Sequence, residues 1–149
     1  MDRPFVEENA RERMRLRSLV GRLTDEELNL PVGTDWTIAI ALAHLAFWDQ
    51  RSAVLMRIWK ATGDVSPSPI DIDVANESLL PLWLALPPRA AANLAVSAAE
   101  EIDLEIEEAS PELISTIELL GDRFRLYRSS HRKMHLDGIE GALKKKGAR

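Results

Sequence analysis

Apolar residues recur at the spacing of an α-helix through most of this chain, and no segment of useful length alternates with the period of a β-strand. Four long helices in a chain of 149 residues favour one all-α domain over residues 1–149, with a four-helix bundle as its architecture. The predicted helices run from Pro4 to between Leu28 and Pro31, and over residues 37–61, 89–109 and 123–145.

Proline, glycine and hydroxyl residues mark the breaks between these helices. Thr37 is expected to cap the second helix, which Thr62-Gly63-Asp64 then ends. The connection to the third helix is long and contains residues 71–86, which are expected to form one or two short helices interrupted by Pro81. A short loop forces neighbouring helices to run antiparallel, whereas this long connection permits a crossover.

Two shorter elements and part of the core are also predicted. Thr24 can cap a short turn after the first helix, and Ser110-Pro111-Glu112 is expected to open a short helix. Among the tryptophans, Trp48 is expected near a pocket and the other three in packing. The predicted core positions of the third helix are Leu94, Ile102, Leu104 and Ile106, and the packing tryptophans are Trp36, Trp59 and Trp83.

Charge and composition exclude several classes of partner. The formal net charge is −5, whereas binding to nucleic-acid phosphates relies on clustered Lys and Arg, so no nucleic-acid partner is expected. No apolar run reaches the roughly 18 residues of a membrane span, so no membrane partner is expected either. The sequence contains no cysteine, which excludes disulfides and cysteine zinc ligands and suits the expected cytoplasmic location.

All three histidines lie in predicted helices with apolar neighbours. His131 and His135 are four residues apart, so their side chains lie on one face of a helix and both imidazoles can reach one ion. His44, on the second helix, would complete the three-histidine set that catalytic zinc sites use, with a fourth position left for water. The alternative is that each histidine is a hydrogen-bonded core or surface residue, since this spacing also arises by accident.

Three short motifs occur in order along most of the chain. A tryptophan and a hydroxyl residue open the second helix before a histidine, an Asp-containing segment ends in Asn, and two histidines four apart precede a Leu and an Ile-Glu pair. Together these features resemble the signature of the DinB/YfiT-like superfamily. The motifs are Asp35-Trp36-Thr37-Ile38 with Ala43-His44-Leu45-Ala46-Phe47-Trp48-Asp49, then Ile72-Asp73-Val74-Ala75-Asn76, and the segment from His131 to Glu140.

The resemblance implies an up-down-down-up four-helix bundle, a topology that needs a long connection between helices two and three. It also implies that the metal triad of the family corresponds to His44, His131 and His135, with zinc or nickel as the expected ion. Characterised relatives include metal-dependent transferases that use a low-molecular-weight thiol, an isomerase that uses such a thiol, and small hydrolases that act on electrophilic toxins. A low-molecular-weight thiol is therefore a candidate cofactor.

Two functions from different classes follow. The first is a divalent-metal-dependent enzyme that activates water or a thiol against a small electrophilic substrate, as a hydrolase or S-transferase in detoxification or stress. The second is a stress-related protein that binds or sequesters a small molecule, with a structural or dispensable metal. Three histidines without a fourth protein ligand favour the enzyme, because structural zinc sites usually have four ligands. An exposed apolar helix face would allow a homodimer.

Two polar residues are candidates for the substrate pocket besides Trp48. Asp49 is expected either to orient a ligand or substrate, or to form a surface ion pair with Arg51 or Arg123. Asn76 is expected either to hydrogen-bond in the pocket or to cap a helix over residues 77–80. Arg132 directly follows the first histidine of the pair, where a zincin has its general-base glutamate, so a metalloprotease of this class is excluded.

Overall fold

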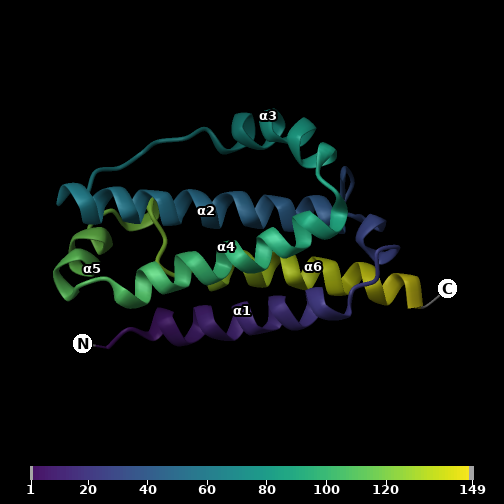
Figure 1. Ribbon diagram of the computed structural model, residues 1–149, viewed down its shortest axis with the longest axis horizontal. Coiled ribbons are helices and arrows are strands. Elements are labelled where there is room, and N and C mark those ends of the chain that lie inside the picture. Colours follow the sequence, from purple (N-terminus) through teal and green to yellow (C-terminus); the bar gives the residue numbers. More distant parts are fainter. Residues whose placement is uncertain (1, 148–149) are drawn as a thin grey trace.

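The computed structural model describes residues 2–147, and across that range it is almost entirely helical (Figure 1). Its α-helices are α1 (Pro4–Arg22), α2 (Ile38–Thr62), α3 (Ile72–Ala85), α4 (Pro88–Glu108), α5 (Pro111–Glu118) and α6 (Ser129–Gly147). The connecting segments contain two 3₁₀ turns, η1 (Glu27–Asn29) and η2 (Gly121–Arg123). They also contain a two-stranded antiparallel hairpin of β1 (Pro31–Val32) and β2 (Trp36–Thr37). The prediction of an all-α fold is confirmed, with one short hairpin as the only strand structure in residues 2–147.

The four long helices α1, α2, α4 and α6 lie side by side and form the body of the molecule (Figure 1). In that view α1 and α6 run toward the end at which the C-terminus is marked, and α2 and α4 run the opposite way. The connection from α2 to α4 therefore returns along the length of the bundle. It contains α3, which lies against α2.

Local capping explains where several helices begin and end. Thr37 accepts a hydrogen bond from the Ile40 amide at the start of α2, and Gly63 ends that helix with φ of 73°. Thr24 and Glu27 bond reciprocally, as in a capping box, across the turn that leads into η1, and Ser110 caps α5. The predictions for Thr37, Thr24 and Ser110 are confirmed.

Two predicted helix boundaries are wrong. α1 ends at Arg22 rather than near Leu28, because the chain turns at Thr24 into the separate η1. α6 begins at Ser129 rather than Arg123, since η2 and an extended segment occupy residues 121–128. In that segment Phe124 and Leu126 point into the core, so burial of alternate residues has replaced the helical pattern.

The predicted core of α4 is half wrong. Leu94 is 46% exposed and Leu104 is 52% exposed, whereas Ile102 and Ile106 are buried. The buried face of α4 consists largely of alanine, and small side chains allow the extensive contact between α4 and α2. The buried alanines are Ala91, Ala92, Ala95, Ala98 and Ala99.

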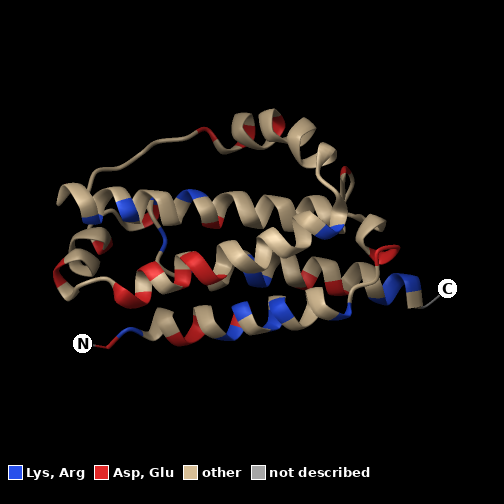
Figure 2. Ribbon diagram, in the orientation of Figure 1, with Lys and Arg blue, Asp and Glu red and all other residues tan. Residues whose placement is uncertain are grey.

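Charges on neighbouring helices are complementary. Figure 2 shows acidic residues gathered on the part of α4 nearest α5, beside basic residues on α1 and α2. Glu105 accepts bonds from both Arg57 and Lys60 of α2, and Arg13 of α1 pairs with Asp103. The exposed pairs stabilise the fold by at most about 1 kcal/mol each.

No helix within residues 2–147 is both long enough and apolar enough to cross a lipid bilayer.

Candidate metal centre

The first histidine of the site is carried by the most deeply buried part of the bundle. Every residue of α2 from Ile38 to Ala46 is buried, because apolar residues occupy all faces of its first turns. His44 lies within this segment and is only 5% exposed. Its imidazole is therefore directed into the protein, toward α6 and α3, where polar partners must be provided.

His131 and His135 lie one turn apart on α6 and face His44. The ring centroids of His44 and His131 are 4.8 Å apart, those of His44 and His135 are 4.7 Å apart, and those of His131 and His135 are 4.8 Å apart. One nitrogen from each ring lies within 4.8 Å of the other two. The structure thus brings together three residues from two helices that are far apart in the sequence.

A hydrogen-bond relay fixes the tautomer of His44. The indole nitrogen of Trp48 can only donate, and it donates to Oδ1 of Asn76 over 3.0 Å. The same oxygen lies 3.2 Å from Nδ1 of His44, so Nδ1 must carry the proton and donate as well. Nε2 of His44 is consequently unprotonated and has a free lone pair directed at His131.

The donor set fits a divalent metal ion. Nε2 of His44 lies 2.9 Å from Nε2 of His131, a contact that two lone pairs tolerate only if a proton or a cation lies between them. Nε2 of His135 is buried and has no hydrogen-bond partner among the described residues. Unpaired buried nitrogens are costly, and coordination by the three imidazoles would satisfy all of them.

Burial keeps the three imidazoles neutral at neutral pH. It lowers the pKa of His44 to about 4, with a further contribution from His135, and lowers the pKa of His131 to about 3, with contributions from the other two histidines and nearby Arg128 and Arg132. Burial also lowers the pKa of His135. Neutral imidazole is the form that binds a metal, so these ligands need little deprotonation.

Tryptophan rings form the walls of the centre. The ring centroid of Trp36, from the hairpin, lies 4.8 Å from that of His44 and 6.2 Å from that of His135, on which the indole stacks. Trp83 of α3 meets His44 edge-on at 5.7 Å. The prediction that these tryptophans pack in the core is confirmed, since Trp36 and Trp83 belong to one core cluster and Trp59 to another. Trp36 and Trp83 also border the histidines, which was not predicted.

The crossover helix contributes Asn76 directly to the site. Asn76 lies within α3, and Asp71 caps that helix by accepting from the Val74 amide. The alternative that Asn76 caps a helix over residues 77–80 is therefore wrong. Its amide oxygen instead bonds Trp48 and His44, so α3 is held over the histidines by its own polar contact.

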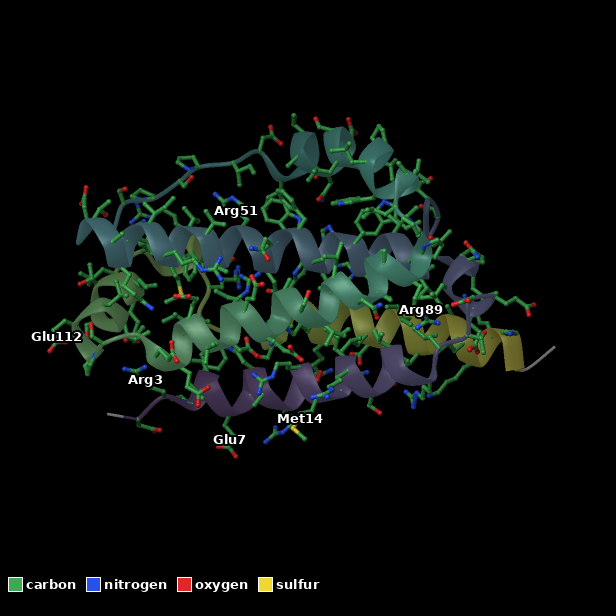
Figure 3. The ribbon with its side chains drawn as sticks, in the orientation of Figure 1. Arg3, Glu7, Met14, Arg51, Arg89 and Glu112 are labelled. Atoms are coloured by element: carbon green, nitrogen blue, oxygen red, sulfur yellow. The ribbon has the colours of Figure 1, made fainter. Side chains whose placement is uncertain are left out.

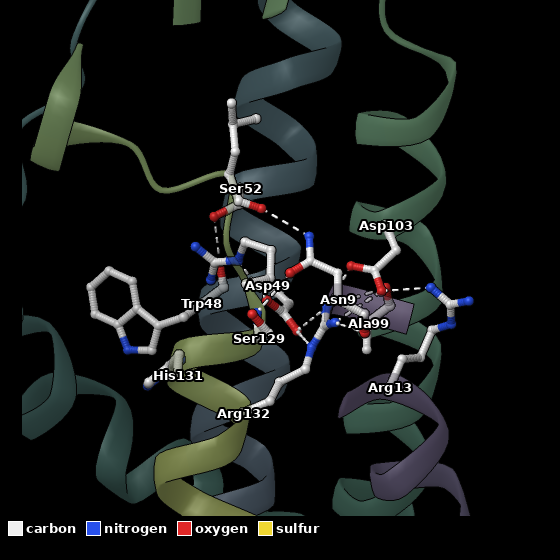
Figure 4. Close-up of polar contacts among 12 residues, drawn as sticks. Asn9, Arg13, Trp48, Asp49, Ser52, Ala99, Asp103, Ser129, His131 and Arg132 are labelled. Carbon is white, nitrogen blue, oxygen red and sulfur yellow. Dashed lines mark hydrogen bonds and ion pairs between the residues drawn. The ribbon is translucent and has the colours of Figure 1, made fainter. Parts of the chain in front are cut away.

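Asp49 lies on α2 but belongs to a different cluster. It is 1% exposed, and its carboxylate accepts from Nε of Arg128 over 2.9 Å and from Arg132 (Figure 4). The prediction of a surface pair with Arg51 or Arg123 is wrong, because the partners are buried arginines 79 and 83 residues further along the chain. Among residues 2–147 the only candidate metal-binding group found is the three histidines, so no carboxylate joins them.

Sequence reasoning missed the structural importance of Arg132. This residue is fully buried, and its guanidinium bonds Asp49, both oxygens of Asp103 and the backbone of Asn9 (Figure 4). The cluster separates two apolar core clusters and fixes α6 beside α2 and α4. A signal was available, because Arg132 lies four residues before Leu136 on the buried stripe of α6.

Comparison with known families agrees with this site. A family model described as the DinB superfamily matches residues 8–134, which include His44, Asn76 and His131 and end directly before His135. Comparisons with curated proteins and with solved structures found no match. Since the family model covers most of the chain and confirms the resemblance of its motifs, the protein belongs to the DinB superfamily.

Proposed function

We propose that this protein is a divalent-metal-dependent enzyme that acts on a small electrophilic molecule. In this proposal His44, His131 and His135 hold one zinc or nickel ion, and water or a low-molecular-weight thiol is the nucleophile. The reaction is then a hydrolysis or an S-transfer, and the setting is the cytoplasm. The up-down-down-up order of the family is part of the proposal, and the helix directions in Figure 1 support it.

The observation that carries the proposal is the relay from Trp48 through Asn76 to His44. A histidine that binds a metal needs a group that accepts from its N–H, fixes the orientation of the ring and keeps the other nitrogen unprotonated. Asn76 is that acceptor for His44, and Trp48 holds the Asn76 amide in place. The relay does this for Nε2 of His44, which faces the other two histidines.

The three histidines would hold the ion, and with three protein ligands a tetrahedral ion would keep one position for water or substrate. When bound, such an ion acts as a Lewis acid that generates a nucleophile from water or thiol near neutral pH. His131 and His135 are partly exposed whereas His44 is buried, which supports an approach to the centre from the α6 side. Trp36 and Trp83 pack against His44 and help to shield its ring from water.

The proposal is tested with protein purified without a histidine tag, stripped with a chelator and reloaded with zinc or nickel. A panel of thiols is combined with alkyl halides, epoxides and activated esters, and turnover is measured with and without metal. Turnover is expected only with metal, and it should be lost in His44→Ala but kept in Gln50→Ala, an exposed control on the same helix. Stoichiometric metal binding without any metal-dependent turnover would favour the binding or sequestering protein instead.

A further inference from the structure

A cleft of about 380 Å³ lies beside the metal centre, on the far side of Trp48. Its walls come from α2, from residues 67–72 of the crossover and from residues 122–128 before α6. Its volume falls in the range of small-molecule sites, roughly 300–1,000 Å³. Trp48 lines the cleft, and its ring centroid also lies 6.4 Å from that of His44, so this side chain stands between the cleft and the histidines.

The cleft is cationic although the protein as a whole is acidic. Four of its lining residues are arginines and only one is an acid, against a net charge of −5 for the chain. The acid, Asp122, lies 3.9 Å from Arg125, and both of these side chains are largely exposed. Asp49 offsets the charge on Arg128. The excess positive charge of the cleft therefore comes from the other three arginines in its lining.

Arg51 is the clearest case of an arginine without a counter-ion. Figure 3 shows it on α2, reaching toward the crossover segment. Its guanidinium donates to the Ser68 carbonyl over 2.5 Å and lies 5.9 Å from the Trp48 ring centroid, and within the described residues it has no carboxylate partner. Burial, and to a smaller degree the nearby charge of Arg128, lower the pKa of Arg51.

Much of the remaining lining is apolar. Trp48, Ile70, Ile72 and Phe124 contribute large apolar side chains to the cleft. An inorganic anion would gain nothing from these side chains, whereas an organic acid would bury its carbon skeleton against them and its carboxylate against guanidinium groups. The combination favours an amphiphilic anion over a simple one.

We propose that this cleft binds a small organic carboxylate, with Arg51 and Arg125 as its charge partners and Trp48 as the wall that its carbon skeleton packs against. The inference deepens the proposed function and rests on it in one respect: the acid is the substrate or thiol cofactor, and its reacting end extends past Trp48 toward the histidines. Binding itself requires no metal.

The test uses 1-naphthoate and metal-free protein in isothermal titration calorimetry, so that coordination to an ion cannot account for binding. Naphthoate is expected to bind at one site per chain, and at least tenfold more tightly than the neutral 1-naphthalenemethanol. The double variant Arg51→Met/Arg125→Met should lose at least tenfold in affinity. Arg57→Met is the matched control, since Arg57 lies on the same helix but pairs with Glu101 and Glu105, and its affinity should be unchanged.

Three results would overturn the inference: equal affinity for the acid and the alcohol, unchanged affinity in the double variant, or displacement of naphthoate by an equimolar amount of inorganic phosphate. Arg51→Lys should bind naphthoate more tightly than Arg51→Met, because lysine keeps the positive charge. Since the protein is metal-free throughout, loss of this inference leaves metal-dependent turnover untouched. Absence of turnover likewise leaves carboxylate binding untouched.

Discussion

Replacing Asn76 by Ala should weaken metal binding, although Asn76 does not lie among the proposed ligands. The substitution removes the oxygen that accepts from Nδ1 of His44 over 3.2 Å and from the Trp48 indole over 3.0 Å. His44 is 5% exposed, so water is a poor substitute for the lost acceptor. The imidazole is then free to carry its proton on Nε2, the nitrogen that must bind the ion.

Loss of such an orienting contact typically reduces metal affinity 10- to 100-fold, which corresponds to about 1.4–2.7 kcal/mol. The assay is a zinc titration of tag-free protein in competition with a chromophoric chelator. Asn76→Asp keeps an acceptor at the same position and should retain affinity, and Glu77→Ala is an exposed control on the same helix. An Asn76→Ala protein that binds zinc within twofold of the wild type would refute the relay.

Three further outcomes are expected. Arg132→Met should lower the free energy of unfolding in urea by at least about 2 kcal/mol, because buried Asp49 and Asp103 each lose one of two cations and keep only Arg128 and Arg13. A loss below about 1 kcal/mol would contradict this. Without metal, the free energy of unfolding should fall as the pH drops from about 6.5 toward 4. The pKa of His44 is about 4 in the folded protein and near 6.5 in the unfolded chain, so the unfolded chain binds more protons in this pH range. His44→Gln should reduce this dependence without removing it, because the pKa values of His131 and His135 are lowered as well, and an unchanged slope would argue against the account. Chelated protein should still unfold cooperatively on heating, since a domain of this size buries about two-thirds of its surface unaided; a disordered chelated chain would show that the metal is structural.

Local chemistry explains why much of the fold was predictable. Thr37, Thr24 and Ser110 cap within three residues of themselves, so the signal and the structure lie in the same short segment. The pairing of His131 with His135 could also be predicted, because the spacing of residues on one helix determines which side chains lie next to each other. His44 needed the family resemblance, since nothing in its own segment says which helix it faces.

The features that were missed depend on partners distant in the sequence. Leu94 and Leu104 look like core residues of α4, but the close approach of α2 selects the alanine face instead. Asp49 and Arg132 are 83 residues apart, and no local pattern shows that they pair in the interior. Trp36 reaches the histidines because a short hairpin turns it inward. Helical periodicity can indicate that Arg132 is buried, but it does not show which distant residues any of these side chains contact.

The central claim is that three histidines bind one divalent ion, and calorimetric titration of zinc into chelated, tag-free protein tests it most directly. One ion per chain is expected for the wild type and for Met134→Ala, a 60% exposed neighbour on α6. His44→Ala, His131→Ala and His135→Ala should each lose this stoichiometric binding while their helical circular dichroism is kept. Binding of one ion with wild-type affinity in any of the three histidine variants would contradict the claim.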